Sequence, residues 1–163
     1  MANPDILQEA DVFIERDWEN IVRDIESLVA VPSVVDFATA TPKSPSGEDA
    51  HDGLRAAVDL ASRLGFDARD DAGEVGIADL PGTSGTVLAL MCHADVVTPG
   101  SGWTGDPWIM RRRDGFLIGR GVIDDKGPLV MALYAMRFFA EKDQQLPYTL
   151  RMIIGTNEET GTM

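Results

Sequence analysis

The sequence has little of what marks secreted or membrane proteins. It contains one cysteine among 163 residues, which excludes an internal disulfide and fits a reducing compartment. Its longest apolar stretch, Leu129 to Ala140, is interrupted by Arg137 and is too short to span a bilayer. The N-terminal segment is acidic where a signal peptide would be basic. These absences predict a cytoplasmic protein.

Basic residues are also scarce. The chain has 14 lysines and arginines against 27 aspartates and glutamates, which gives a net charge of −13. Its one basic run is Arg111 to Arg113, and three residues do not form a track for phosphates. This charge balance argues against nucleic acid and against an anionic membrane as partners.

The remaining composition is that of a globular domain, with 44% hydrophobic and 25% charged residues. Helical and extended patterns alternate along the chain, which predicts an α/β fold with a mostly parallel central sheet covered on both sides by helices. Helices are expected from Pro4 to about Val31, over Glu48–Leu64 and from Gly127 to about Lys142. Strands are expected over Glu74–Leu80, Thr86–Cys92, Gly115–Ile118 and Tyr148–Ile154.

One expected strand reads "TVLALMC", Thr86 to Cys92, and is apolar on both faces. Such a pattern is typical of an interior strand of a helix-covered sheet. His93-Ala94-Asp95 follows directly. Residues two apart in an extended segment share a face, so His93 can bind a metal while Asp95 accepts the other ring N–H. Cys92 points to the opposite face and is assigned to the core. Taken alone, this His-x-Asp pattern is also compatible with a capped histidine at a strand end.

Two further acidic pairs follow later strands. Asp124 and Asp125 precede an apolar helix, where they could bind a metal or simply cap the helix N-terminus. Glu158 and Glu159 follow the strand that ends at Ile154, and a solvated acidic turn is the alternative there. The second histidine, His51, lies in the polar part of a helix and is expected at the surface.

Together, one imidazole and several carboxylates at strand ends predict a divalent-metal site. Two zinc ions about 3.5–4 Å apart need a bridging carboxylate, which one of Asp124 and Asp125 can supply. The glutamate pair divides naturally into one metal ligand and one unligated base. Trp103 and Trp108, in the loop before the second motif, are candidates for a pocket wall or for packing.

Three segments, "MCHADVVTPGSGW", "DGFLIGRGVIDDKGP" and "GTNEETG", resemble motifs of the dinuclear zinc metallopeptidases related to glutamate carboxypeptidase. That family also includes acetylornithine deacetylase and succinyl-diaminopimelate desuccinylase. The segments "IDDKGP", "GTNEETG" and "GEVGIADLPG" are most similar to its dipeptidase branch, of the PepV and carnosinase-like type. The similarity runs in order from about Asp11 to the last residue.

The resemblance implies a role for each motif residue. His93 is expected to bind one zinc ion and Glu159 the other, with Asp124 as the bridge between them. Asp95 is expected to orient His93, and Asp125 to lie beside the bridge without ligating. Glu158 is the expected general base, so the resemblance places Glu158 and Asp95 in the catalytic apparatus. The peptide bond between Asp124 and Asp125 is expected to be cis.

The implied activity is zinc-dependent hydrolysis of dipeptides by a metal-activated water. Two zinc ions are expected in a complete site, with cobalt or manganese as alternatives; no oligomeric state is implied. Members of the family are well over twice this length and carry further ligands and a lid domain. Residues 1–163 are therefore expected to be an N-terminal fragment of the catalytic domain, inactive alone and lacking the lid or dimerisation domain. The alternatives are an N-acyl-amino-acid deacylase of the same family and a truncated, non-catalytic protein.

Overall fold

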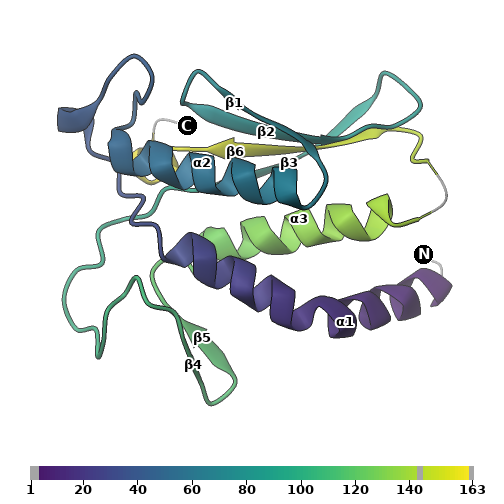
Figure 1. Ribbon diagram of the computed structural model, residues 1–163, viewed down its shortest axis with the longest axis horizontal. Coiled ribbons are helices and arrows are strands. Elements are labelled where there is room, and N and C mark those ends of the chain that lie inside the picture. Colours follow the sequence, from purple (N-terminus) through teal and green to yellow (C-terminus); the bar gives the residue numbers. More distant parts are fainter. Residues whose placement is uncertain (1–3, 143–144, 162–163) are drawn as a thin grey trace.

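The computed structural model describes residues 4–142 and 145–161, which form one four-stranded sheet, a two-stranded hairpin and three α-helices (Figure 1). The elements follow the chain in the order α1 (Pro4–Val29), η1 (Phe37–Thr39), α2 (Glu48–Arg63), β1 (Asp67–Asp71), β2 (Val75–Leu80), β3 (Val87–His93), β4 (Arg111–Arg113), β5 (Phe116–Ile118), α3 (Lys126–Ala140), β6 (Thr149–Gly155) and η2 (Glu158–Thr160), where η marks a 3-10 helix.

The sheet has the strand order β1-β2-β6-β3. A tight turn joins β1 to β2, and its central residues Ala72 and Gly73 both have positive φ, as an antiparallel hairpin requires. The connection from β3 to β6 includes α3, and this crossover allows the two strands to pair in parallel. β2 pairs antiparallel with β6. The predicted α/β class is confirmed, with a mixed sheet whose β3–β6 pair is the parallel part.

A glycine lets α2 approach this sheet closely. A Cβ atom at Gly76 of β2 would lie 2.9 Å from side-chain atoms of both Leu54 and Val58 in α2. It would also lie 3.3 Å from Cβ of Ile154 in β6. Leu54 and Ile154 are both fully buried, so α2 packs on the face of the sheet to which Ile154 points.

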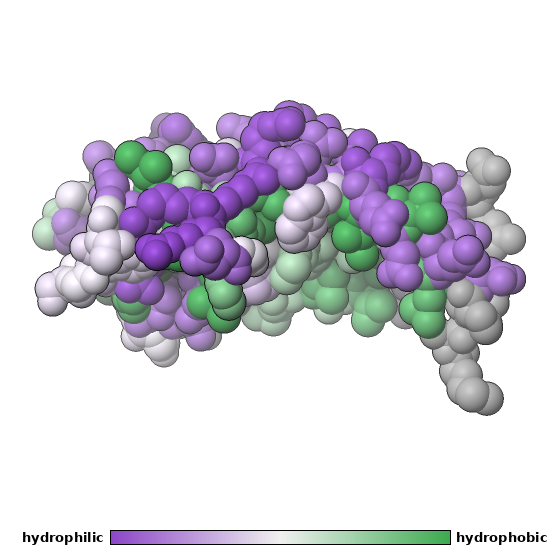
Figure 2. All heavy atoms as spheres, turned by 90° about the horizontal axis from the view of Figure 1, so that it is seen from below, coloured by the Kyte–Doolittle hydropathy of each residue, from purple (hydrophilic) through white to green (hydrophobic). Residues whose placement is uncertain are grey.

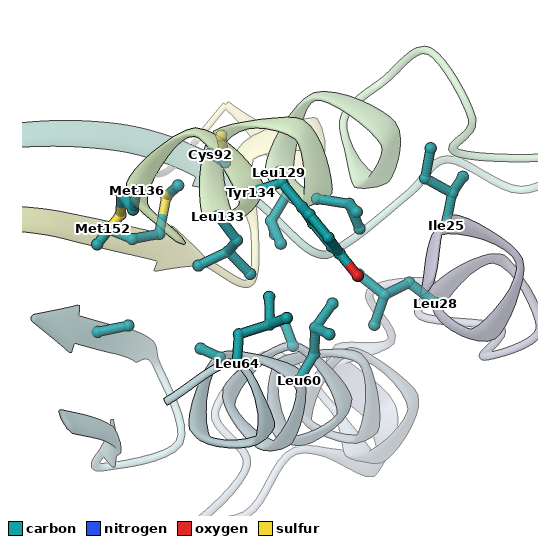
Figure 3. Close-up of a cluster of buried hydrophobic side chains, with 14 of the residues drawn as sticks. Ile25, Leu28, Leu60, Leu64, Cys92, Leu129, Leu133, Tyr134, Met136 and Met152 are labelled. Atoms are coloured by element: carbon teal, nitrogen blue, oxygen red, sulfur yellow. The ribbon is translucent and has the colours of Figure 1, made fainter. Parts of the chain in front are cut away.

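The same face is covered by α3. Figure 3 shows Leu133 and Met136 of α3 close to Met152 of β6, and all three side chains are buried. Met152 and Ile154 are two residues apart in one strand and therefore point to the same face. In the described residues the helices thus cover one face of the sheet, where the sequence predicted helices on both. The other face is not wholly apolar, because Arg151 and Asp79 form a two-pronged ion pair there at 2.7 Å.

A buried carboxylate ties α1 to the other two helices. Asp24 of α1 is 4% exposed. It accepts hydrogen bonds from the Arg63 guanidinium of α2 at 2.7 Å and from the Tyr134 hydroxyl of α3 at 2.8 Å. Burial and the adjacent Asp24 raise the pKa of Tyr134, so its hydroxyl stays protonated and keeps donating. This shared acceptor sets how α1 lies across α2 and α3.

The outer side of α1 and α3 carries an apolar groove of about 500 Å³. Four of its lining side chains, Leu7, Ile14, Trp18 and Met131, are each about half exposed. Figure 2 views the molecule from this side and shows hydrophobic residues gathered between hydrophilic ones. No helix in the described ranges is long and apolar enough to cross a membrane.

Strand β3 lies at the end of the sheet, where the sequence predicted an interior strand. Val87, Leu88 and Met91 are 47%, 50% and 64% exposed. Within residues 4–142 and 145–161, β6 is the strand that pairs with β3, and no strand lies along its other edge. The apolar pattern of Thr86 to Cys92 correctly predicted a strand. It also predicted a neighbouring strand on each side, and in the described sheet β3 has one neighbour, β6.

An exposed apolar edge of this kind favours pairing between copies of the chain, because Val87 to Cys92 carry no charged side chain that would oppose the approach of another strand. We expect Met91→Lys to reduce self-association and to leave the melting temperature close to that of the wild type. Sedimentation velocity over a concentration series measures this. Phe37→Lys, at a site 57% exposed outside the sheet, is the control. A wild-type chain that is monomeric at all concentrations would contradict the prediction.

Candidate functional site

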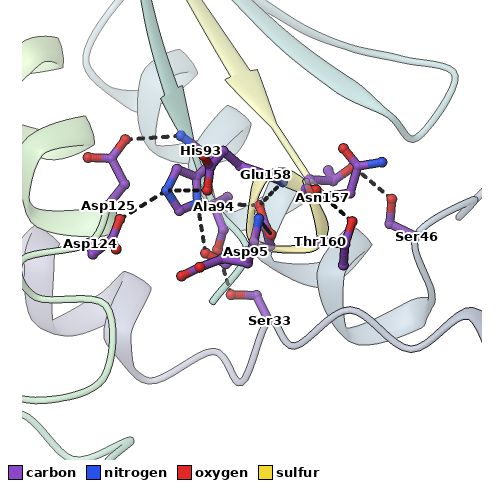
Figure 4. Close-up of polar contacts among 12 residues, drawn as sticks. Ser33, Ser46, His93, Ala94, Asp95, Asp124, Asp125, Asn157, Glu158 and Thr160 are labelled. Carbon is purple, nitrogen blue, oxygen red and sulfur yellow. Dashed lines mark hydrogen bonds and ion pairs between the residues drawn. The ribbon is translucent and has the colours of Figure 1, made fainter. Parts of the chain in front are cut away.

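The parallel pairing of β3 with β6 brings two of the three motifs together, the one with His93 and Asp95 and the one with Glu158 and Glu159. His93, the last residue of β3, is in register with Gly155, the last residue of β6. One residue further on, the backbone N–H of Ala94 donates to the carbonyl of Gly155 at 2.9 Å. The carboxyl ends of both strands thus reach the same edge of the sheet. His93, Asp95 and the turn that carries Glu158 and Glu159, here called the glutamate turn, lie side by side there (Figure 4).

His93 is buried and is held through one ring nitrogen. Its Nδ1 lies 3.0 Å from the backbone carbonyl of Asp95 and 3.4 Å from the Asp95 carboxylate. Both partners are acceptors, so Nδ1 carries a hydrogen and donates it. Nε2 on the opposite side of the ring faces Asp124 Oδ1 at 3.1 Å and Glu158 Oε2 at 3.7 Å. Burial lowers the pKa of His93, but Asp95 and the charge of Asp125 outweigh it and raise the pKa to about 9.

Asp95 is fully buried and is the acceptor at the centre of this edge. Its two carboxylate oxygens accept the backbone N–H groups of Glu158 at 3.3 Å and Glu159 at 3.1 Å. Burial would raise the pKa of the Asp95 carboxyl. The hydrogen bonds from His93 and from the two backbone N–H groups outweigh that effect and hold the pKa below its usual range. Asp95 is therefore ionised.

The third motif approaches from the segment before α3. The peptide bond between Asp124 and Asp125 is cis, as the family resemblance implied. Asp124 turns one oxygen toward His93 Nε2 (Figure 4). Asp125 occupies the N-cap position of α3 but makes no side-chain capping bond to the helix. Its Oδ2 instead accepts the backbone N–H of His93 at 3.1 Å, so the alternative of a simple helix cap does not describe this pair.

The two glutamates differ in their surroundings. The Glu158 side chain is 50% exposed and reaches toward His93. Burial and the negative charge of Asp124 raise the pKa of Glu159. Asp124 and Glu158 thus both lie within 3.7 Å of Nε2 of His93.

The chemistry of these side chains fits a divalent metal ion. An imidazole nitrogen and several carboxylate oxygens are ligands that zinc accepts, and a cation would relieve the repulsion between neighbouring carboxylates. In the described residues, however, no three such side chains converge closely enough to hold an ion as they stand. The metal ligands expected from the sequence are therefore near one another but do not form a complete coordination sphere in the described residues.

Two residues that support the site were not identified from the sequence. Ser33, fully buried, donates its hydroxyl hydrogen to the carbonyl of Ala94 at 2.6 Å, and its own carbonyl accepts the N–H of Val96 at 3.0 Å. Ser33 therefore clamps both sides of Asp95. A Cβ atom at Gly53 of α2 would lie 2.4 Å from Cβ of Ser33, so only glycine leaves room for this clamp.

The second supporting residue is Lys126, the first residue of α3. It is 1% exposed, and its ammonium donates to the carbonyl of Val31 at 2.6 Å. Burial lowers the pKa of Lys126 to about 7, opposed by the charge of Asp95. Lys126 lies within the "DDKGP" motif, and this position was the signal in the sequence that could have identified it. Its hydrogen-bond partner, the carbonyl of Val31, could not be predicted from that motif.

Other candidate residues lie outside this group. His51 pairs with Asp70 of β1 at 2.7 Å, which links α2 to the sheet and uses the imidazole structurally. Trp103 donates its indole N–H to the carbonyl of Pro99 at 2.8 Å, and the Arg120 guanidinium lies 5.6 Å from its ring centre. Trp108 is half-buried in the same loop. Cys92 is buried, as predicted.

Comparison with known proteins points to one family. The family described as "Peptidase family M20/M25/M40" matches residues 89–163, which include all three motifs. The chain is 37% identical over 150 residues to the protein named "Putative dipeptidase YtjP" of Bacillus subtilis (strain 168). That alignment covers 92% of this chain and 32% of the relative.

Solved structures agree with this assignment. Human carnosine dipeptidase 1 matches with a TM-score of 0.76 and 28% identity, over 94% of this chain and 35% of that one. The M20 family metallo-carboxypeptidase Sso-CP2 from Sulfolobus solfataricus has the same fold, with a TM-score of 0.71 and 21% identity over 87% of this chain and 32% of that one. The chain spans about a third of the length of the relatives it matches. Residues 89–163, which carry all three motifs, thus belong to the M20/M25/M40 peptidase family.

Proposed function

We propose that this chain is the N-terminal part of the catalytic domain of a zinc-dependent dipeptidase. The observation that carries the proposal is the placement of His93. Asp95 holds its Nδ1, while its Nε2 faces the carboxylates of Asp124 and Glu158. The dipeptidases among its relatives support the choice of substrate class.

In this proposal His93, Asp124 and Glu159 are the residues that would hold the zinc. Bound zinc would supply Lewis acidity, which polarises a peptide carbonyl and makes water more acidic. Asp95 keeps a hydrogen on Nδ1 of His93, so that Nε2 is the atom available for coordination. Asp125 does not ligate and fixes the backbone of His93.

Glu158 is proposed as the proton carrier. Its side chain is half exposed and lies 3.7 Å from Nε2 of His93, so it is accessible to solvent beside the proposed ligands. A carboxylate there can take a proton from the attacking water and pass it to the leaving amine. Removal of such a base costs roughly 10²–10⁴-fold in rate.

We also propose a cytoplasmic location. Cys92, the one cysteine of the sequence, is free and buried. Burial and the neighbouring Asp125 raise the pKa of Cys92 to about 12, which keeps it a thiol. A cysteine used in this way fits a reducing compartment.

The substrate class is tested with the product of the complete open reading frame that encodes this chain. We expect it to hydrolyse dipeptides in the presence of zinc, cobalt or manganese and to be much slower on N-acetyl and N-succinyl amino acids. Chromatographic quantification of released amino acids measures both. Faster cleavage of the acylated substrates would favour a deacylase of the same family, and no cleavage of either would favour a non-catalytic protein.

The 163-residue chain by itself is expected to be inactive on dipeptides. No three metal-ligating side chains in the described ranges converge, so the ion and substrate would not be held in reacting geometry. The same chromatographic assay, run on pure chain with added zinc, measures this. Zinc-dependent turnover by the pure chain that disappears in Glu158→Ala would overturn the prediction.

The division of roles within the glutamate pair predicts different phenotypes in the active enzyme. Glu158→Ala should lower kcat by roughly 10²–10⁴-fold with zinc content near that of the wild type, because a base does not hold the ion. His93→Ala and Glu159→Ala should instead lower the zinc content. Kinetics and metal analysis of the same preparations separate the two effects. Glu48→Ala, which removes an exposed glutamate from α2, is the control. Equal zinc loss in Glu158→Ala and Glu159→Ala would refute the assignment.

A further inference from the structure

The glutamate turn has an unusual way of satisfying its first backbone N–H groups. η2 begins after Asn157, which occupies the N-cap position but makes no side-chain capping bond. The first N–H groups of a helix have no partner within the helix and need an outside acceptor. Here the acceptor is Asp95, which follows β3 and lies more than 60 residues away in the sequence.

The register of the sheet explains how Asp95 reaches this position. His93 pairs with Gly155 in the parallel ladder, so Asp95 and Asn157 each stand two residues beyond a matched pair. The carboxylate of Asp95 therefore lies beside the start of η2. Each of its oxygens takes one N–H, from Glu158 and from Glu159 (Figure 4).

The burial of Asp95 makes these bonds costly to lose. A fully buried carboxylate needs several donors to offset its desolvation. The donors on Asp95 are the two backbone N–H groups and, at 3.4 Å, Nδ1 of His93. The charge of buried Lys126 also acts on it. Two of the three hydrogen-bond donors thus come from the glutamate turn, and one comes from the histidine.

We propose that Asp95 is a positioning residue for the glutamate pair as well as for His93. By capping η2 from the neighbouring strand, its carboxylate sets where the Glu158 and Glu159 side chains begin relative to the imidazole. One buried group then fixes the spacing between the histidine and the base, which is 3.7 Å from Nε2 to Glu158 Oε2. The proposal rests on the proposed function for the meaning of that spacing, but the capping itself can be tested without metal or substrate.

The test is amide hydrogen exchange by NMR on the metal-free chain. In the wild type, the amides of Glu158 and Glu159 should exchange slowly, because both donate to a buried carboxylate. Asp95→Asn keeps the shape of the side chain but leaves one acceptor oxygen and adds an NH₂ group. At least one of the two amides should then exchange roughly tenfold to a hundredfold faster, as expected for the loss of a hydrogen bond to a charged group.

Two further variants separate this role from other effects. Asp36→Asn changes another aspartate whose carboxylate accepts an N–H at the start of a 3-10 helix, that of Ala38 at 2.9 Å, and should leave both glutamate amides unchanged. His93→Ala removes the imidazole and keeps Asp95, so both amides should stay protected. If His93→Ala releases them as much as Asp95→Asn does, the turn is held through the histidine and the proposal is wrong.

A wild-type measurement keeps the proposal open to refutation even if Asp95→Asn does not fold. Glu158 and Glu159 amides that exchange at the rate of an unstructured peptide in the wild-type chain would overturn it directly. A failure of dipeptide hydrolysis in the active enzyme, by contrast, would count against the proposed function and leave these exchange rates unaffected. The two failures are therefore distinguishable.

Discussion

The site is organised around one ionised carboxylate that has no contact with solvent. Asp95 lies where β3 ends, and two segments of the chain meet on it: the end of β3 through His93, and the turn after β6 through the backbone N–H groups of Glu158 and Glu159. A buried carboxylate with several hydrogen-bond donors tolerates few rearrangements, because the loss of any donor leaves its desolvation uncompensated. The orientation of His93 and the start of the turn that carries Glu158 and Glu159 follow from that constraint.

The sequence predicted the framework of the site because the framework is local. Each motif stands directly after an apolar strand or before an apolar helix, and both patterns are visible in single segments. The strand over Asp67–Asp71 was not predicted, since "DARDD" is almost entirely charged and forms the exposed first strand of the sheet. Its pairing with β2 is set by the Ala72-Gly73 turn more than by its own residues. The strand β4 was missed for a similar reason, because Arg111 to Arg113 appeared only as a basic run.

The supporting contacts could not be predicted, because they join residues far apart in the chain. Lys126 and Val31 are 95 residues apart, and Ser33 and Ala94 are 61 apart. Nothing in the segment Val31-Pro32-Ser33 indicates that Ser33 will form hydrogen bonds with the residues on both sides of Asp95. The same holds for Gly53, whose missing side chain matters only because Ser33 lies against it. Such residues become apparent once the strands are in register, and the register itself arises from the packed sheet.

The exposed edge of β3 and the site are parts of one strand, which couples them physically. The N–H of Ala94 points inward and donates to Gly155, whereas the N–H of His93 points the other way and is accepted by Asp125. Backbone groups alternate in direction along a strand, so the edge that displays Val87 and Met91 is continuous with the edge that Asp125 closes. Asp125 therefore occupies the backbone donor of His93 at the point where the open edge of β3 meets the site.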